Sequence, residues 1–320
     1  MGNSDKIINT SSFSKAAVIG GGMIGSSFAV VFAMAGLEVS VYNNHSTLAK
    51  TIRERIRSFM MFLAEEEVIT AQQAEQSLGR ISITEDLTEA LADADYIQEC
   101  MWEDLELKQD IFRTLTDMTG PEVPIGSSCS GLCISDIVKK VQNHPERCMV
   151  AHPTNPPHLI PFMEISGDAA SQEAKDRVYD FFERVGQKPI QCKEVYGYVL
   201  NRLQLSLIQE ALYLVKEDIC NVAAVDRALT DGLGLRWAFT GPYGVEELNS
   251  ENLAIGLEKY KDYMLEFFTK EQQTVRDYDG EFIQKCVEGF TPVMGDKTHD
   301  EYRLWRDRMV TRTRKLKDNA

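Results

Sequence analysis

The first half of the chain alternates short apolar runs with longer stretches of helical character. Seven runs rich in apolar and β-branched side chains predict strands at 16–19, 38–42, 96–100, 124–128, 148–152, 162–165 and 189–192. Helices are predicted at 23–35, across the long amphipathic region 46–78, and at 105–118 and 171–185. This alternation predicts an α/β fold, a Rossmann-type doubly wound sheet that is mostly parallel and carries helices on both faces.

The second half changes to an almost wholly helical pattern. After the segment "KEVYGY", helices are predicted at 199–216, 222–230, 251–268, 281–287 and 301–317, with Gly232, Gly234 and the pair Gly241-Pro242 as breaks. We therefore predict a Rossmann domain at 1–196 and an all-α domain at 197–320 that closes the substrate site. Its apolar helices, such as "LSLIQEALYLV", predict either the core of a homodimer or helices buried in a monomer.

A glycine loop joins the first predicted strand to the first helix. Gly20, Gly22 and Gly25 satisfy the pattern G-x-G-x-x-G. In such loops the first glycine makes a tight turn, the second lets the backbone approach a pyrophosphate, and the third lets the helix pack close to the strand. The helix begins at Met23 and Ile24, and the backbone N–H groups at this N-terminus are free to bind phosphates. The loop therefore predicts a dinucleotide site.

The second strand ends on Asn43, where dinucleotide sites usually carry Asp or Glu. An asparagine can still hydrogen-bond a ribose hydroxyl, but it has no charge to repel a 2′-phosphate. No arginine follows the strand immediately to hold that phosphate. The sequence therefore predicts NAD as the cofactor, with NADP kept as an alternative.

One histidine stands at the end of a predicted strand, in the segment "VAHPTNPPHLIPFMEIS". His152 lies at the sheet edge where α/β proteins bind ligands, and Glu164 follows inside an apolar strand. A carboxylate beside a histidine fixes its tautomer and stabilises the imidazolium, and alcohol oxidation needs a base near neutral pH. The pair is a candidate catalytic dyad, and the alternative is a core histidine with a buried structural acid.

Together with these features, the segments "AHPTNPP", "GYVLNRL" and "DGLGLRWAF" resemble the 3-hydroxyacyl-CoA dehydrogenase superfamily. The resemblance runs from residue 16 to about 316 and is greatest to the branch that contains L-gulonate 3-dehydrogenase (lambda-crystallin) and L-carnitine dehydrogenase. It implies that His152 is the catalytic base and Glu164 its partner. It also implies a dimer.

The resemblance assigns further roles at matching positions. Ser130 would contact the substrate hydroxyl and the nicotinamide, Asn201 would hold the substrate oxygen, and Asn155 would lie near the nicotinamide. Glu103 and Lys108 would contact the cofactor. Taken alone, Ser130 and Asn201 could instead be helix caps, and Glu103 and Lys108 an exposed ion pair on a helix.

The substrate is expected to be a small hydroxy or keto acid. Arg236 and Trp237 lie among glycines, where an arginine in a turn can present its planar fork to a carboxylate, or can cap helix carbonyls instead. Relatives that oxidise gulonate and carnitine carry a similar segment, which favours a free 3-hydroxy acid. A CoA thioester and a noncatalytic, crystallin-like role are the alternatives.

Composition restricts the partners further. The net charge of −15 argues against nucleic acid or an anionic membrane as the main partner. The apolar run 28–37 is too short to span a bilayer, and seven scattered cysteines without a CxxC pair predict a reducing, cytoplasmic location. No metal site is expected. The cluster of Arg and Lys at 303–317 predicts a solvated last helix.

Overall fold

The structure is a computed structural model that describes residues 13–270 and 280–319. The chain divides into two compact units. The sheet unit contains Met1–Asn201 and Asp307–Asp318, and the helical unit contains Arg202–Arg306.

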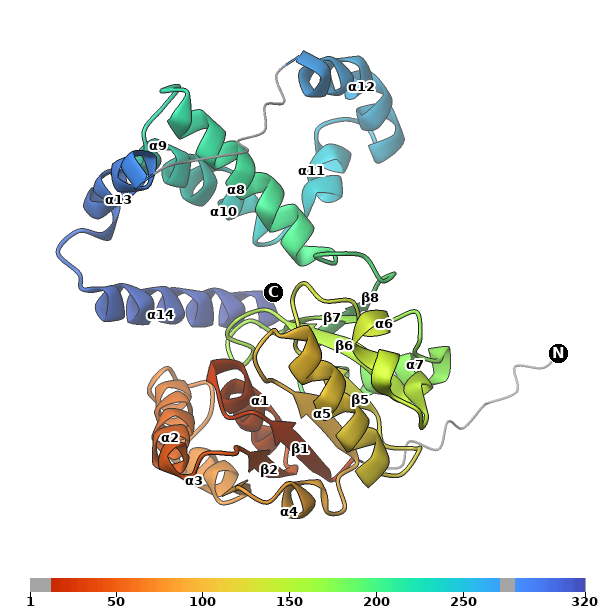
Figure 1. Cartoon of the computed structure of the whole chain (residues 1–320). Helices are drawn as coiled ribbons and strands as arrows, with labels where there is room; N and C mark the ends of the chain where they lie inside the picture. Colours follow the sequence, from red (N-terminus) through yellow and green to blue (C-terminus); the bar gives the residue numbers. More distant parts are fainter. Residues whose placement is uncertain (1–12, 271–279, 320) are drawn as a thin grey trace. The chain divides into compact units, whose positions relative to one another are not determined.

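The sheet unit is built on one eight-stranded sheet with the order β3-β2-β1-β4-β5-β6-β7-β8 (Figure 1). All neighbouring strands are parallel except β6 and β7, which are antiparallel. The mostly parallel, doubly wound sheet is confirmed. The strands are β1 (Lys15–Ile19), β2 (Glu38–Tyr42), β3 (Ile81–Thr84), β4 (Tyr96–Glu99), β5 (Ile125–Ser127), β6 (Cys148–Pro153), β7 (Phe162–Ser166) and β8 (Lys188–Gln191).

Helices cover both faces of the sheet. They are α1 (Met23–Met34), α2 (Ala49–Glu65), α3 (Ala71–Leu78), α4 (Leu87–Leu91), α5 (Leu105–Met118), α6 (Ile134–Ile137) and α7 (Gln172–Arg184), with short 3₁₀ turns at η1 (Ser46–Leu48), η2 (Val138–Lys140) and η3 (Pro145–Arg147). On one face, Phe28 and Phe32 of α1 pack with Phe181 and Phe182 of α7. On the other face α5 and α6 pack against β1, β4 and β5 (Figure 1). These two aromatic and aliphatic layers hold the strand ends of the site in place.

The middle of the sheet unit differs from the prediction at several elements, since the short helices α4 and α6 were not predicted. The strand β3 was not predicted, because its sequence "ISIT" is only half-buried at the sheet edge and gives a weak apolar signal. The predicted amphipathic stretch 46–78 is two helices, since α2 ends at Glu65 and α3 starts anew at a capping box formed by Thr70 and Gln73.

The described part of the helical unit contains helices and the loops that join them, and no strand. The helices are α8 (Leu200–Lys216, which starts in the sheet unit), α9 (Val222–Arg227), a π-helical turn η4 (Ala228–Leu233), α10 (Gly234–Trp237), α11 (Pro242–Leu248), α12 (Leu253–Lys270), α13 (Gly280–Met294) and α14 (His299–Asp318). Gly241 and Pro242 start α11, as expected. Gly232 and Gly234 do not break the chain, so the prediction of a glycine-rich turn there was wrong. Their backbone follows helical turns from 222 to 237.

The two compact units divide after Asn201, and the last part of α14 (307–318) belongs to the sheet unit. There Arg308 binds Glu65 at 2.5 Å and Glu66 at 3.1 Å, and Arg312 binds Glu66 at 3.3 Å. The last helix is therefore not simply solvated, because its arginines pair with the acids that end α2.

The described helices include none that is long and apolar enough to cross a membrane.

Candidate active site

The glycine loop has the geometry that its pattern predicts. Gly20 has φ +107°, and a Cβ there would lie 2.8 Å from the carbonyl oxygen of Cys100. A Cβ at Gly25 would lie 1.9 Å from the carbonyl oxygen of Gly20, so only glycine lets α1 approach the loop. A Cβ at Gly22 meets nothing within 4 Å, because this position faces open space at the start of α1. The loop thus fits a pyrophosphate above Gly22.

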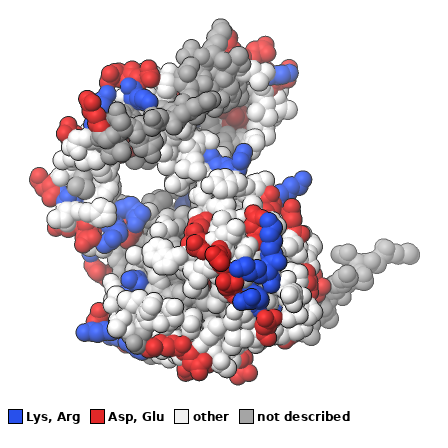
Figure 2. All heavy atoms as spheres, in the orientation of Figure 1, with Lys and Arg blue, Asp and Glu red and all other residues white. Residues whose placement is uncertain are grey.

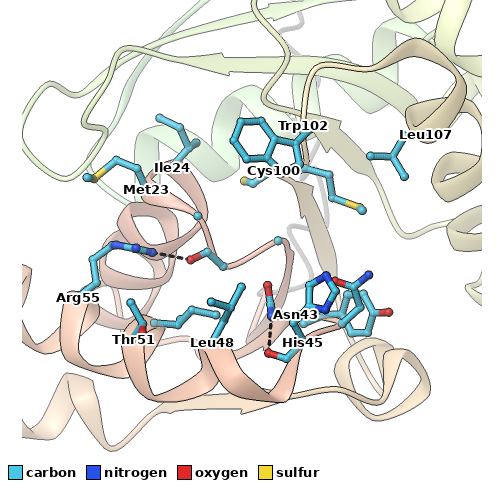
Figure 3. A pocket seen from close by; sticks show the side chains of 17 residues that line it. Met23, Ile24, Asn43, His45, Leu48, Thr51, Arg55, Cys100, Trp102 and Leu107 are labelled. Atoms are coloured by element: carbon cyan, nitrogen blue, oxygen red, sulfur yellow. Dashed lines mark hydrogen bonds between the residues drawn. The ribbon is translucent and has the colours of Figure 1, made fainter.

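A cavity of about 560 Å³ lies over this loop (Figure 3). Its floor is Gly20–Ile24, and Asn43 and His45 after β2 lie on one side. The Asn43 amide donates to the carbonyl oxygen of His45 at 3.0 Å, which turns the backbone after β2 and holds the side chain at the cavity. The side chain that follows β2 at this cavity is therefore uncharged.

A second cavity, of about 330 Å³, adjoins the first and shares Ile24, Cys100, Met101 and Trp102 with it. Six residues assigned from the sequence line this cavity: Ile24, Glu103, Lys108, Ser130, His152 and Asn155. They come from α1, the β4–α5 segment, α5, the loop after β5, the end of β6 and the loop that follows it. The fold therefore brings together residues that are far apart in the sequence, at the carboxyl edge of the parallel strands.

His152 and Glu164 face each other across the antiparallel pair β6–β7, where they are direct partners in the strand register. Nδ1 of His152 lies 2.8 Å from Oε2 of Glu164. The other carboxylate oxygen accepts hydrogen bonds from the backbone N–H groups of Val199 and Leu200, each at 2.8 Å. Glu164 is fully buried, whereas His152 is 6% exposed and lines the second cavity. The histidine is thus part of a cavity wall, with Nε2 as its remaining ring nitrogen.

Glu103 anchors the loop after β5. Its carboxylate accepts hydrogen bonds from the Ser130 hydroxyl at 2.7 Å and from the backbone N–H groups of Ser130, Gly131 and Leu132. Partial burial opposes ionisation, but these hydrogen bonds outweigh it and hold the pKa of Glu103 below its usual range. The amide of Asn201 donates to the Ser130 carbonyl oxygen at 3.0 Å. Ser130 and Asn201 therefore lie side by side at this loop.

Lys108 is not part of an exposed ion pair with Glu103, so that interpretation was wrong. Its ammonium lies 2.7 Å from both carboxylate oxygens of Glu99, and both side chains are buried. Glu99 also accepts from the Ser127 hydroxyl at 2.6 Å and from the backbone N–H of Met101 at 2.7 Å. Lys108 thus fixes the end of β4 and the segment that separates the two cavities.

Sequence reasoning missed several residues of this region. Glu99 and Gln98 are polar residues inside the buried strand β4, and Gln98 donates to the Ser128 hydroxyl at 2.8 Å. Two polar residues in the apolar run "YIQEC" were a usable signal. Trp102 lines both cavities although its side chain is 85% exposed, and nothing in its sequence position indicated this.

Arg236 and Trp237 lie on α10 in the helical unit, where Arg236 is exposed and Trp237 half-buried. Residues 228–237 are helical, so Arg236 is carried by a helix and not by a turn. Within the described residues, no group of three or more His, Cys, Asp or Glu side chains could hold a metal ion.

The glycine loop, the two joined cavities and the mostly parallel sheet define a dinucleotide-binding protein of the dehydrogenase class. Comparison with known proteins then gives the family. The NAD-binding domain of 3-hydroxyacyl-CoA dehydrogenase matches residues 15–195, and the C-terminal domain of the same enzymes matches residues 197–275. The chain belongs to the 3-hydroxyacyl-CoA dehydrogenase family and is an NAD-dependent dehydrogenase. The resemblance seen in the sequence is confirmed.

Individual relatives match this chain over more than nine tenths of its length. The chain is 34% identical over 305 residues to lambda-crystallin from Oryctolagus cuniculus, which covers 94% of this chain and 95% of that protein. It is 30% identical over 298 residues to L-carnitine dehydrogenase from Pseudomonas aeruginosa, with coverage of 91% and 90%. An archaeal 3-hydroxyacyl-CoA dehydrogenase from Archaeoglobus fulgidus superposes with a TM-score of 0.67 at 25% identity, over 95% of this chain and 97% of that one.

The fold is shared more widely. The structure of an NAD⁺-dependent dismutase, 5-formyl-3-hydroxy-2-methylpyridine 4-carboxylic acid 5-dehydrogenase, superposes with a TM-score of 0.80 at 24% identity, over 96% of this chain and 99% of that one.

Proposed function

We propose that the protein oxidises the secondary 3-hydroxyl of a small free hydroxy acid to the 3-keto acid, with NAD as the hydride acceptor. The observation that carries this proposal is the His152–Glu164 contact in a cavity that adjoins the cofactor cavity. A histidine with one nitrogen held by a buried carboxylate is suited to accept a hydroxyl proton near neutral pH.

The proposed reaction consists of a hydride transfer to the cofactor and a proton transfer to His152. When bound, NAD⁺ supplies the acceptor for the hydride of the carbinol carbon. His152 takes the hydroxyl proton through Nε2, because Nδ1 is engaged by Glu164. As the ring becomes an imidazolium, the Glu164 carboxylate stabilises the new positive charge. In the reverse direction His152 returns the proton to the oxygen of the keto acid.

Ser130 and Asn201 are proposed to hold the substrate oxygen. The substrate hydroxyl gives its one proton to His152, so the groups that hold its oxygen must act as donors. The Ser130 hydroxyl donates to Glu103 in this structure and would turn its hydrogen to the substrate oxygen when a substrate binds. The Asn201 amide uses one N–H on the Ser130 carbonyl oxygen and has a second N–H available. The two side chains can thus both donate to the substrate oxygen, as a hydroxyl oxygen that becomes a carbonyl oxygen requires.

A free acid is the proposed substrate class, with L-gulonate-like and L-carnitine-like acids as the leading examples. Relatives that match more than 90% of this chain are L-carnitine dehydrogenase and lambda-crystallin. We assign the substrate carboxylate to Arg236, with Trp237 beside it on α10. A short-chain 3-hydroxyacyl-CoA is the second candidate, because that is the substrate named by the family. A noncatalytic, crystallin-like protein is the third, and the retained His152–Glu164 pair speaks against it.

The test is NAD⁺ reduction by the purified protein with L-gulonate, L-carnitine, 3-hydroxybutyrate and 3-hydroxybutyryl-CoA. The proposal expects turnover with at least one free acid, and a raised KM for it in Arg236→Gln. Turnover with the CoA ester alone would instead support the second candidate, a 3-hydroxyacyl-CoA dehydrogenase. Cofactor binding without turnover on any of the four would contradict the proposal as stated.

The cofactor proposal extends to NADP. Asn43 places no carboxylate at the ribose, so NADP⁺ is proposed as a weaker second cofactor. Comparing kcat/KM for NAD⁺ and NADP⁺ in wild type and Asn43→Asp tests this, since the carboxylate should lower the value for NADP⁺ alone. An unchanged ratio would show that Asn43 does not set the choice.

We further propose a cytoplasmic homodimer without nucleic acid or membrane as a partner. Helix α8 exposes four large apolar side chains, Leu203, Leu205, Leu207 and Ile208, which water disfavours. Light scattering during size-exclusion chromatography should give twice the chain mass, and Leu203→Glu with Leu205→Glu should reduce it. A monomeric mass for the wild type would contradict the proposal.

A further inference from the structure

We propose that Arg55 binds a phosphate group of the cofactor held on the glycine loop. Arg55 is on α2, a helix to which the sequence analysis gave no site residue. The inference rests on the proposed use of a nicotinamide dinucleotide and concerns the residue that recognises its phosphates.

The position of Arg55 is fixed by the glycine loop itself. Its Nη1 donates to the carbonyl oxygen of Gly21 at 2.9 Å (Figure 3). The same atom contacts the Ser26 hydroxyl at 3.5 Å. Gly21 immediately precedes Gly22, the N-cap of α1, where a pyrophosphate would lie. The guanidinium is therefore attached to the loop beside the phosphate position.

The rest of the guanidinium is available to a ligand. Arg55 is half-buried and lines the first cavity. Within the described residues, its Nε and Nη2 atoms have no hydrogen-bond partner. An arginine presents its N–H groups in a fixed planar fork that matches phosphate oxygens, so one edge can hold Gly21 while another binds the ligand.

The charges around the cavity also favour an anion. Asp and Glu side chains are spread widely over the visible face of the molecule (Figure 2), and the whole chain carries a net charge of −15. The lining of the first cavity nevertheless includes no Asp or Glu, and Arg55 is its one Arg or Lys. The one cation in a lining that has no carboxylate gives this cavity a site that attracts a phosphate.

Helix α2 provides a matched control. Arg57 lies on the same helix but is exposed, is paired with Glu75 at 2.5 Å, and does not line the cavity. Replacing Arg57 changes the net charge of the protein as much as replacing Arg55 does. A specific effect of Arg55 can therefore be separated from a general effect of charge.

The experiment is calorimetric titration of NAD⁺ and NADP⁺, without substrate, into wild type, Arg55→Gln, Arg55→Lys and Arg57→Gln at several salt concentrations. We expect Arg55→Gln to weaken binding about tenfold, the scale of one charge-assisted hydrogen bond. Its dissociation constant should also depend less on salt, Arg55→Lys should retain part of the affinity, and Arg57→Gln should match wild type.

The two cofactors distinguish which phosphate is bound. Equal weakening of NAD⁺ and NADP⁺ assigns Arg55 to the pyrophosphate, which its contact with Gly21 favours, and weakening of NADP⁺ alone assigns it to the 2′-phosphate. Unchanged affinity for both overturns the proposal. Equal losses in Arg55→Gln and Arg55→Lys with unchanged salt dependence also overturn it, because they indicate support of Gly21 only. Since no turnover is measured, failure of the proposed oxidation leaves this result unaffected.

Discussion

The carboxylate of Glu164 lies with one oxygen 2.8 Å from Nδ1 of His152 and with the other 2.8 Å from the backbone nitrogens of Val199 and Leu200. One buried acid therefore orients the histidine and caps the start of helix α8. Three hydrogen-bonded groups compensate the cost of burying its charge, since an unpaired buried carboxylate would be strongly disfavoured.

Glu164→Gln is expected to lower kcat about 100-fold. An amide has one oxygen in place of two, so it cannot accept from the backbone N–H groups and hold the imidazolium charge together. The measurement is steady-state NAD⁺ reduction, with calorimetric NAD⁺ binding as the control for the fold. Binding should change less than twofold. A variant with wild-type kcat would show that the contact is structural only.

Glu103→Gln is expected to lower kcat/KM about tenfold, because the amide cannot accept the four hydrogen bonds that hold 130–132. The lowered pKa of Glu103 has a further consequence. A carboxyl with a depressed folded-state pKa contributes stability above its unfolded pKa and loses it as the pH falls through the folded value. The anchor should thus persist in mild acid.

The check is kcat/KM of wild type and Glu103→Gln between neutral and mildly acidic pH, alongside the melting temperature. The ratio of the two proteins should stay constant over this range. A ratio that approaches one near the ordinary carboxyl pKa would mean that Glu103 is already protonated there.

Lys108→Met should destabilise the sheet unit by about 3–5 kcal/mol, since it leaves the buried Glu99 carboxylate without its cation. Adding Glu99→Gln removes the unpaired charge and should recover most of the loss. Urea unfolding of the single and double variants measures both effects. If the double variant is as unstable as the sum of the two single variants, the residues are not coupled in this way.

His158 should make the protein sensitive to acid. Burial, with a contribution from Arg314, lowers its pKa from 6.5 to about 3, and Nδ1 lies 2.6 Å from the Ser27 hydroxyl. Below about pH 6.5, His158 is protonated in the unfolded chain but stays neutral in the folded protein. The free energy of unfolding therefore falls as the pH drops.

Urea unfolding at pH 7 and pH 5 measures this contribution. The loss in wild type should exceed that in His158→Gln by up to about 1.4 kcal/mol per pH unit. His299→Gln, at an exposed position, serves as the control. Equal losses in wild type and His158→Gln would contradict the assignment.

Much of the sheet unit could be predicted because its signals are local. The strand-loop-helix pattern around Gly20, Gly22 and Gly25 and the apolar runs of β1, β2 and β6 occur within a few residues. The edge strand β3 could not be predicted, since it is half-buried and short. The helical continuity through Gly232 and Gly234 was also missed, because neighbouring turns override the low helix propensity of glycine.

For the site, spacing suggested His152 with Glu164, and the antiparallel turn between β6 and β7 makes them direct partners. Glu103 and Lys108 are close in sequence yet bind different partners, Ser130 and Glu99, because Glu103 precedes α5 whereas Lys108 lies on it. Trp102 and Arg55 could not be found from the sequence. Only the fold brings α2 and the β4–α5 segment to the glycine loop.

The most direct test of the central claim is NAD⁺ reduction by wild type and His152→Gln with the same free 3-hydroxy acid at saturating NAD⁺. The account predicts turnover by wild type and a loss of about 100-fold or more in the variant, with NAD⁺ affinity retained, because a general base contributes roughly 10²–10⁴-fold. Equal turnover by a correctly folded His152→Gln protein would contradict it.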